Sequence, residues 1–132
     1  MYLFSTIINK GYEDMTEQIE ECLINKVCVP CMGGVPPLAE DVVQRYLKEL
    51  GNEWSLDKQG HLYREYIFMN FMESMNFANK IAELAEKEAH HPDLTIAWGK
   101  CVVEMWTHKI NGLTESDFVL AAKIEKLANE SF

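Results

Sequence analysis

Basic side chains are scarce in this sequence of 132 residues. Lys and Arg number 12 against 21 Asp and Glu, which gives a formal net charge of −9. A nucleic-acid-binding surface needs clustered positive charge, so this balance argues against direct contact with DNA or RNA. It also disfavours anionic membranes and highly phosphorylated substrates. A neutral small molecule is the ligand that the charge suits best.

Long apolar runs and dense cysteine patterns are also missing. No run is long enough to cross a bilayer, and residues 1–8 lack the basic segment and cleavage site of a signal peptide. Four cysteines are too few to predict a disulfide scaffold. We therefore expect a cytoplasmic protein without a membrane span. An organelle stays open, because a start at Met15 would leave the preceding residues as an appendage.

The remaining composition suits one globular domain preceded by an arm. Hydrophobic residues make up 48% of the chain, which is enough to bury a core. Residues 1–35 are predicted to form a leader, because closely spaced Pro and Gly residues forbid regular structure over 28–38. Residues 36–132 carry the helical and strand patterns and are predicted to form the domain.

The hydrophobic periodicities predict the order α-β-β-α-β-β-α. Helices are expected over 38–50, 70–91 and 114–132, and strands over 54–57, 61–69, 94–98 and 101–108. Two hairpins pair most simply as one sheet, so the predicted fold is α+β, a four-stranded antiparallel sheet with three helices packed on one face. The other face would be exposed, and its apolar residues would favour self-association.

Three of the four histidines fall within residues 86–117. His90 and His91 stand where the long helix must stop before Pro92, and His108 stands where a strand stops. Two element ends can converge, which would make an imidazole-lined pocket. The negative end of the helix dipole favours a proton on an imidazole there, as an acid catalyst needs. The alternative for His90 and His91 is that they only cap the end of the helix, and the alternative for His108 is an exposed loop histidine.

Neighbouring residues allow functional and ordinary interpretations side by side. Glu86, four residues before the first histidine of the tandem, could orient and charge-support that imidazole, or be a solvated surface carboxylate. Asp117 follows Thr114 by three residues, fits a capping box and is interpreted as structural. Trp54 and Trp98 could flank a flat heterocycle, although core packing is the commoner use of Trp.

Cys28-x-x-Cys31 is the main competing signal. Such a pair could contribute to a zinc site, but zinc usually takes four protein ligands and no second pair is visible. A loop motif is therefore favoured over a metal site, and no metal ligand is predicted.

One combination of residues, at particular intervals, points to a known family. It consists of Glu86-x-x-x-His90-His91-Pro92, Trp98, His108 ten residues later, and Asp117 within Leu-Thr-Glu-x-Asp. Together these residues resemble pterin-4a-carbinolamine dehydratases, a family also described as dimerisation cofactors of a homeodomain transcription factor. The likeness covers about residues 36–130, and the upstream Cys-Val-Pro-Cys run is similar to a leader found in bacterial and plant members.

The resemblance implies dehydration of 4a-hydroxytetrahydropterin to quinonoid dihydropterin during recycling of the cofactor of aromatic amino-acid hydroxylases. It implies the four-stranded fold above, homodimers or homotetramers, and no cofactor, because the pterin is the substrate. By motif match the catalytic residues are His90, His91 and His108, with Glu86 in support. The substrate-binding residues that it implies are Ala89, Pro92, Trp106, Thr107, Lys109, Trp54 and Trp98.

Two points stay open within the resemblance. Lys109 departs from the acidic residue that some members carry after the Thr-His pair, which puts its own role in doubt. Family members can also act as partners of transcription factors, so a non-catalytic interaction module is the alternative function.

Overall fold

The computed structural model describes residues 22–29 and 33–131. Residues 1–21 of the predicted leader, and Cys31 of the cysteine pair, lie outside the described residues. The elements are η1 (Leu23–Asn25), α2 (Glu40–Leu50), β1 (Ser55–Leu56), β2 (Leu62–Ile67), α3 (Phe71–Glu88), β3 (Asp93–Ala97), β4 (Lys100–Met105), η2 (His108–Ile110) and α4 (Glu115–Ser131).

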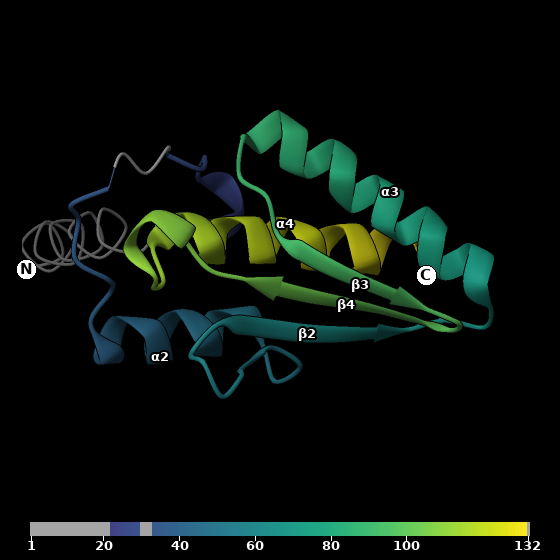
Figure 1. Ribbon diagram of the computed structural model, residues 1–132, viewed down its shortest axis with the longest axis horizontal. Helices are drawn as coiled ribbons and strands as arrows, with labels where there is room; N and C mark the ends of the chain where they lie inside the picture. Colours follow the sequence, from purple (N-terminus) through teal and green to yellow (C-terminus); the bar gives the residue numbers. More distant parts are fainter. Residues whose placement is uncertain (1–21, 30–32, 132) are drawn as a thin grey trace, which may run out of the picture.

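The four strands form one antiparallel sheet in the order β1-β2-β4-β3, with the three long helices beside it (Figure 1). Two hairpins are therefore joined through the β2–β4 pair, whose register matches Leu62 with Met105. A single hydrophobic core takes side chains from all three helices and from the helix-facing side of the sheet. The predicted α+β architecture is confirmed.

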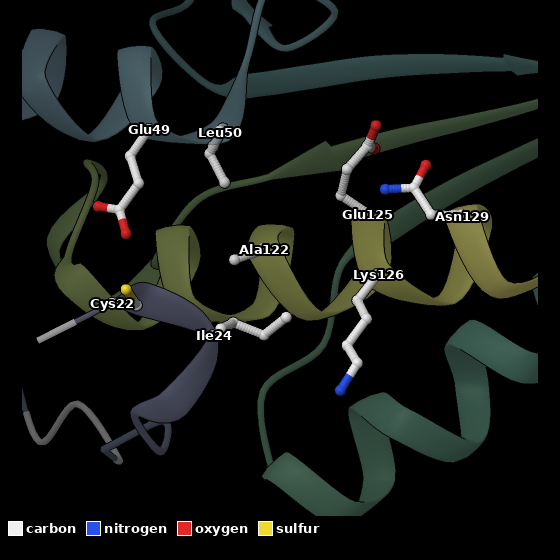
Figure 2. Close-up of a pocket in the computed structure, with 8 residues that line it drawn as sticks. All are labelled: Cys22, Ile24, Glu49, Leu50, Ala122, Glu125, Lys126 and Asn129. Atoms are coloured by element: carbon white, nitrogen blue, oxygen red, sulfur yellow. The ribbon is translucent and has the colours of Figure 1, made fainter.

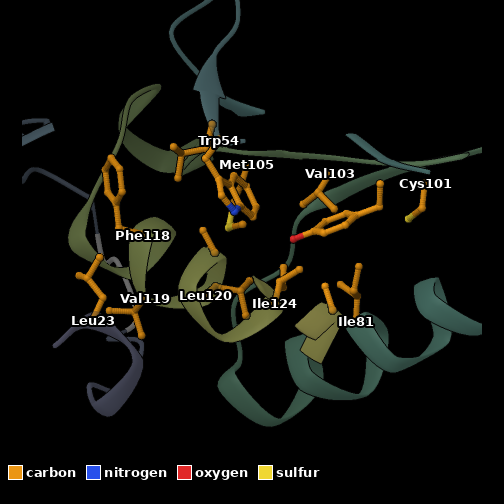
Figure 3. Close-up of a cluster of buried hydrophobic side chains, with 14 of the residues drawn as sticks. Leu23, Trp54, Ile81, Cys101, Val103, Met105, Phe118, Val119, Leu120 and Ile124 are labelled. Atoms are coloured by element: carbon orange, nitrogen blue, oxygen red, sulfur yellow. The ribbon is translucent and has the colours of Figure 1, made fainter. Parts of the chain in front are cut away.

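The core lies between the sheet and α4. Figure 3 shows Phe118, Leu120 and Ile124 of α4 in one cluster with Val103 and Met105 of β4, and all five are fully buried. Alternation along β4 explains why this face is apolar, since every second side chain leaves the strand on the same side. Burial of several such side chains is the main term that stabilises the domain.

Helix α3 begins and ends as its local chemistry requires. The Asn70 side chain accepts a hydrogen bond from Glu73 N at 2.9 Å, and the Glu73 carboxylate accepts one from Met69 N at 2.9 Å. This reciprocal pair satisfies donors that the first turn of a helix leaves free. At the other end Ala89 adopts a left-handed conformation, with φ 52°, and ends the helix.

The second hairpin differs in detail from the prediction. Its turn is Trp98-Gly99, and Lys100 already belongs to β4. Gly99 has φ +70° and lies where an added Cβ would approach the carbonyl oxygen of Phe68 at 3.0 Å, so the turn requires glycine. The predicted strand to His108 was wrong, because β4 ends at Met105 and a Thr107–Gly112 bridge folds the chain into η2.

Part of the described segment before residue 36 is packed against the domain. Leu23 is only 1% exposed and joins the core, and its N–H donates to Glu49 at 3.0 Å. The Cys28 thiol donates to the Ser116 carbonyl at 3.5 Å, and Ser116 Oγ exchanges hydrogen bonds with the backbone of Val29. Residues 23–29 of the arm therefore lie against α4. The division at residue 36 itself stays a prediction.

The described cysteines differ in their expected reactivity. Burial, followed by the Glu88 carboxylate, raises the pKa of Cys28 from 9.0 to about 11, and burial alone raises the pKa of Cys101 to about 11. At pH 8 each thiol should alkylate about 100-fold more slowly than an ordinary cysteine, whereas the exposed Cys22 should react readily. Peptide-level mass spectrometry after timed iodoacetamide treatment measures the three rates.

The same shifts give a pH dependence of stability. Above pH 9 the unfolded thiols ionise while the folded ones keep their protons to about pH 11, so stability should fall across that window.

Protein unfolded in urea is the control for the alkylation measurement. In urea the alkylation rates of all three cysteines should converge. Equal rates in the native chain would contradict the burial of Cys28 and Cys101.

The open face of the sheet is less apolar than predicted. It carries charged residues, including Glu65 and Lys100, whose side chains lie 3.7 Å apart. Outside the N-terminal arm, the large exposed apolar side chains lie at one end of the sheet, where the backbone of Phe68 bonds to Gly99 at 2.8 Å. We call them the end patch; they are Ile67, Met69, Phe71, Met72 and Trp98.

Candidate functional site

A cavity of about 330 Å³ opens at the end of the sheet opposite the end patch. Two chain segments line it, one between α3 and β3 and the other after β4. The lining residues are Ala89, His90, His91, Trp106, Thr107, His108 and Lys109. All seven belong to the predicted site, and the cavity wall contains three imidazoles and no carboxylate.

Strand register brings the two segments together. β3 and β4 are antiparallel neighbours, and Asp93 at the start of β3 pairs with Glu104 near the end of β4. The residues just before β3 and just after β4 must therefore emerge at the same end of the sheet. His90 and His91 come from the first segment and His108 from the second, so the predicted convergence of imidazoles is what this register produces.

His90 is held by a buried carboxylate. Its Nε2 lies 2.7 Å from Oδ1 of Asp117, which has no exposed surface. The other oxygen, Oδ2, accepts hydrogen bonds from Thr107 Oγ1 at 2.8 Å and from Thr114 N at 2.9 Å. An ionised carboxylate only accepts hydrogen bonds, so His90 carries its proton on Nε2 and its Nδ1 is available to a ligand.

The predicted contact between Glu86 and His90 is wrong. Glu86 Oε1 lies 3.3 Å from Nε2 of His91 instead, and both side chains are exposed. The helix ends at Ala89, so the i, i+4 neighbour relation that the prediction assumed does not extend to His90. The support for His90 comes from Asp117, which was interpreted only as a capping residue. Asp117 does cap α4 through Thr114, and it also orients the imidazole.

The third histidine is positioned by ring stacking. The ring of His108 lies 4.2 Å from that of Trp106, centre to centre, with an angle of 19° between the planes. Both rings line the cavity. Since His108 is otherwise exposed on the short helix η2, the indole is the surface against which its ring rests.

Three residues assigned to substrate binding are not among those that line this cavity. Trp54 is 4% exposed, and its indole N–H donates to Glu125 at 3.2 Å within the core. Trp98 is 73% exposed and belongs to the end patch. Pro92 lines a separate hollow of about 700 Å³ on the open face of the sheet. Trp54 packs in the core and Trp98 is exposed to solvent, so neither is placed for the predicted contact with a heterocycle in this cavity.

Neither Cys28 nor the cavity beside η1 is a better candidate. The Cys28 thiol is hydrogen-bonded to the Ser116 carbonyl, and Cys31 lies outside the described residues. A cavity of about 400 Å³ lies between α2, α4 and η1. Figure 2 shows Glu125 and Lys126 leaving α4 in different directions there, and the Glu125 carboxylate is already bonded to Trp54, Tyr66 and Arg64.

Among the described residues, no helix is both long enough and apolar enough to cross a membrane.

Comparison with known proteins identifies the family of this chain. The model of the family described as pterin 4 alpha carbinolamine dehydratase matches residues 36–127. A protein of Rickettsia bellii, whose name assigns it provisionally to that enzyme, is 62% identical over 107 residues, covering 81% of this chain and 95% of its own. A relative from Alkaliphilus metalliredigens with the same name is 49% identical and covers 82% of this chain and 97% of its own.

A solved structure shows the same fold. The crystal structure of a transcriptional coactivator/pterin dehydratase from Brucella melitensis superposes with a TM-score of 0.65 at 31% identity, covering 70% of this chain and 98% of that one. The comparisons of sequence and of fold thus agree. The chain belongs to the pterin 4 alpha carbinolamine dehydratase family.

Proposed function

We propose that this chain dehydrates 4a-hydroxytetrahydropterin to quinonoid dihydropterin. The observation that carries the proposal is the meeting of His90, His91 and His108 around one cavity of about 330 Å³. A cavity of this size is within the range for a small heterocyclic ligand. The lack of carboxylates in its wall suits an uncharged pterin ring system. Membership of the family supplies the substrate class.

The reaction requires proton transfers rather than a cofactor. The nitrogen lone pair of the carbinolamine expels the hydroxyl group from the neighbouring carbon, the C–O bond breaks, and the ring N–H proton is lost. One imidazolium can protonate the departing oxygen so that it leaves as water, and a neutral imidazole can accept the nitrogen's proton. General acid and base assistance of this kind contributes typically 10²–10⁴-fold.

We assign the acid to the side of the cavity formed by His90 and His108, and the base to His91. His90 and His108 are both held in fixed orientations, by Asp117 and Trp106 respectively, which a donor aimed at one oxygen requires. His91 is 58% exposed at its side chain, so it can exchange the accepted proton with solvent. Glu86 beside it supports the imidazolium that forms.

A stopped-flow assay tests the activity directly. Carbinolamine generated in the instrument loses water at a measurable uncatalysed rate, and the purified chain should accelerate the appearance of the quinonoid absorbance. We further propose that this reaction serves recycling of the cofactor of aromatic amino-acid hydroxylases in the cytoplasm. A rate equal to that of buffer alone would reject the proposal.

A non-catalytic role in protein interaction is the second candidate. Two observations favour it: the Brucella melitensis neighbour is titled a coactivator as well as a dehydratase, and the end patch exposes five large apolar side chains at one end of the sheet. Large exposed apolar patches are uncommon on monomeric proteins, and where they occur they commonly mark interaction surfaces. A pure interaction module would show no acceleration in the stopped-flow assay.

The end patch also gives a prediction for self-association, since we propose a homodimer or homotetramer. Met72 is 64% exposed within this patch, on the first turn of α3. Replacing it by Glu should raise the dissociation constant of the oligomer at least about tenfold, because a carboxylate is costly to bury in an apolar contact. Light scattering coupled to size-exclusion chromatography over a concentration series measures the change.

The control for this variant places the same charge elsewhere. Asn129→Glu adds a carboxylate at an exposed polar position on α4, and it should leave the oligomer unaltered. An identical association curve for Met72→Glu and the parent chain would show that the end patch is not the contact surface.

A further inference from the structure

We propose that His61, the one histidine outside the cavity, is a positioning residue for His108. The inference deepens the proposed dehydratase function and rests on it. His61 precedes β2, far from the catalytic segment in sequence, and is 7% exposed. Its ring stacks on Trp106 with centres 3.9 Å apart and planes within 6° of parallel.

The indole of Trp106 is therefore held between two imidazoles. His61 contacts it at 3.9 Å and His108 at 4.2 Å, and only His108 of the two lines the cavity. The rings form a continuous stack that leads from the buried end of the β1–β2 loop to the wall of the pocket. Any tilt of the indole would displace the ring of His108 that rests on it.

Strand register explains why His61 reaches this indole. Leu62 pairs with Met105 across β2 and β4, and continuing that pairing by one residue places His61 opposite Trp106. Glu104 and Trp106 are two residues apart, so their side chains leave the chain on the same side. The Glu104 carboxylate and the face of the Trp106 indole therefore both contact the His61 ring.

His61 is itself fixed by polar contacts. Its Nδ1 lies 3.0 Å from Oε2 of Glu104 and 3.8 Å from Oδ2 of Asp57. Its backbone N–H donates to Oδ1 of Asp57 at 2.9 Å, and its carbonyl accepts from Asp57 N at 2.9 Å. Ring and backbone are both anchored, so His61 can act as a rigid support behind Trp106.

Two substitutions distinguish support of Trp106 by a stacked ring from the filling of volume alone. His61→Phe keeps a flat ring against Trp106 and loses the bond to Glu104, whereas His61→Leu fills similar volume without a flat face. We expect His61→Leu to lower kcat/KM by roughly 10- to 100-fold, with the loss in kcat, because His108 is no longer held in place. His61→Phe should stay within about threefold of the parent chain.

A spectroscopic measurement tests the positioning without reference to activity. The indole face shifts the NMR signals of the His108 ring protons upfield, and a Trp106→Leu variant gives the unshifted reference. In His61→Leu these signals should move toward that reference, and in His61→Phe they should stay near the parent values. Glu65→Gln, on the open face and away from the stack, is the matched surface control.

The outcomes distinguish this inference from the proposed function. If the parent chain shows no dehydratase activity, the proposed function fails, and the His108 signals alone decide whether His61 positions that ring. Unchanged His108 signals in His61→Leu would overturn the inference. So would an equal loss of kcat in the Phe and Leu variants, because that would make the Glu104 contact, rather than the stacked ring, the feature that matters.

Discussion

A double variant, His90→Gln with His108→Gln, should lose about 10²–10⁴-fold of the dehydration rate that the chain provides. Both substitutions remove the groups that we assign to the acid side of the cavity, while glutamine at position 90 can still donate a hydrogen bond to Asp117. The fold should therefore survive. Stopped-flow measurement of quinonoid dihydropterin formation gives the rate, and circular dichroism with thermal unfolding checks the fold.

Glu83→Gln is the control for this variant, because residue 83 lies exposed on α3 and lines none of the cavities described above. The two single histidine variants complete the comparison. When two residues act as one unit, replacing either one removes most of the rate enhancement that both provide. Each single variant should therefore approach the rate of the double variant. Parental rates in a folded double variant would remove His90 and His108 from the mechanism.

Much of the fold could be predicted because its signals are local. The Asn70 and Glu73 pair that begins α3, and the glycine at residue 51 that ends α2, lie within a turn of the boundaries they set. The hairpin loop at 58–60 is equally local. The sheet then followed from pairing two hairpins, which leaves few arrangements.

The candidate site was predictable only in part, because its contacts cross the chain. The residues around the cavity follow from the intervals of the family pattern. The partner of His90 does not, since Asp117 lies 27 residues away and its capping of α4 is a sufficient local explanation for an acidic residue. Ala89 gave no sign that it would end the helix, as a glycine would have done.

His61 shows the same limitation more clearly. Its partners are Glu104 and Trp106, more than 40 residues along the chain, and they meet it only through the register of β2 with β4. Periodicity predicts which residues form strands, but a shift of register by one residue would change every cross-strand partner. Trp54 and Trp98 were misplaced for a related reason, since an aromatic residue at a strand end can face the core, a ligand or solvent.

The strongest expected effect on stability comes from Asp117. It is fully buried and accepts from His90, Thr107 and Thr114. Asp117→Ala leaves these donors without their acceptor in a site closed to water, which should cost about 3–5 kcal/mol of unfolding free energy. Urea denaturation followed by tryptophan fluorescence measures the loss. A change below about 1 kcal/mol would contradict this account of the network.

Asp117→Asn separates the stability of the network from its chemistry. The donors of Thr107 and Thr114 converge on one oxygen, Oδ2, so an asparagine must place its carbonyl there and turn its NH₂ group toward His90. His90 would then have to accept at Nε2, so its ring could no longer hold protons on both nitrogens, as the imidazolium assigned to the acid side of the cavity must. We expect a stability cost of about 1–3 kcal/mol but a rate loss of about 10²–10⁴-fold. A folded Asp117→Asn chain with the parental rate would show that protonation of His90 on both ring nitrogens is irrelevant to dehydration.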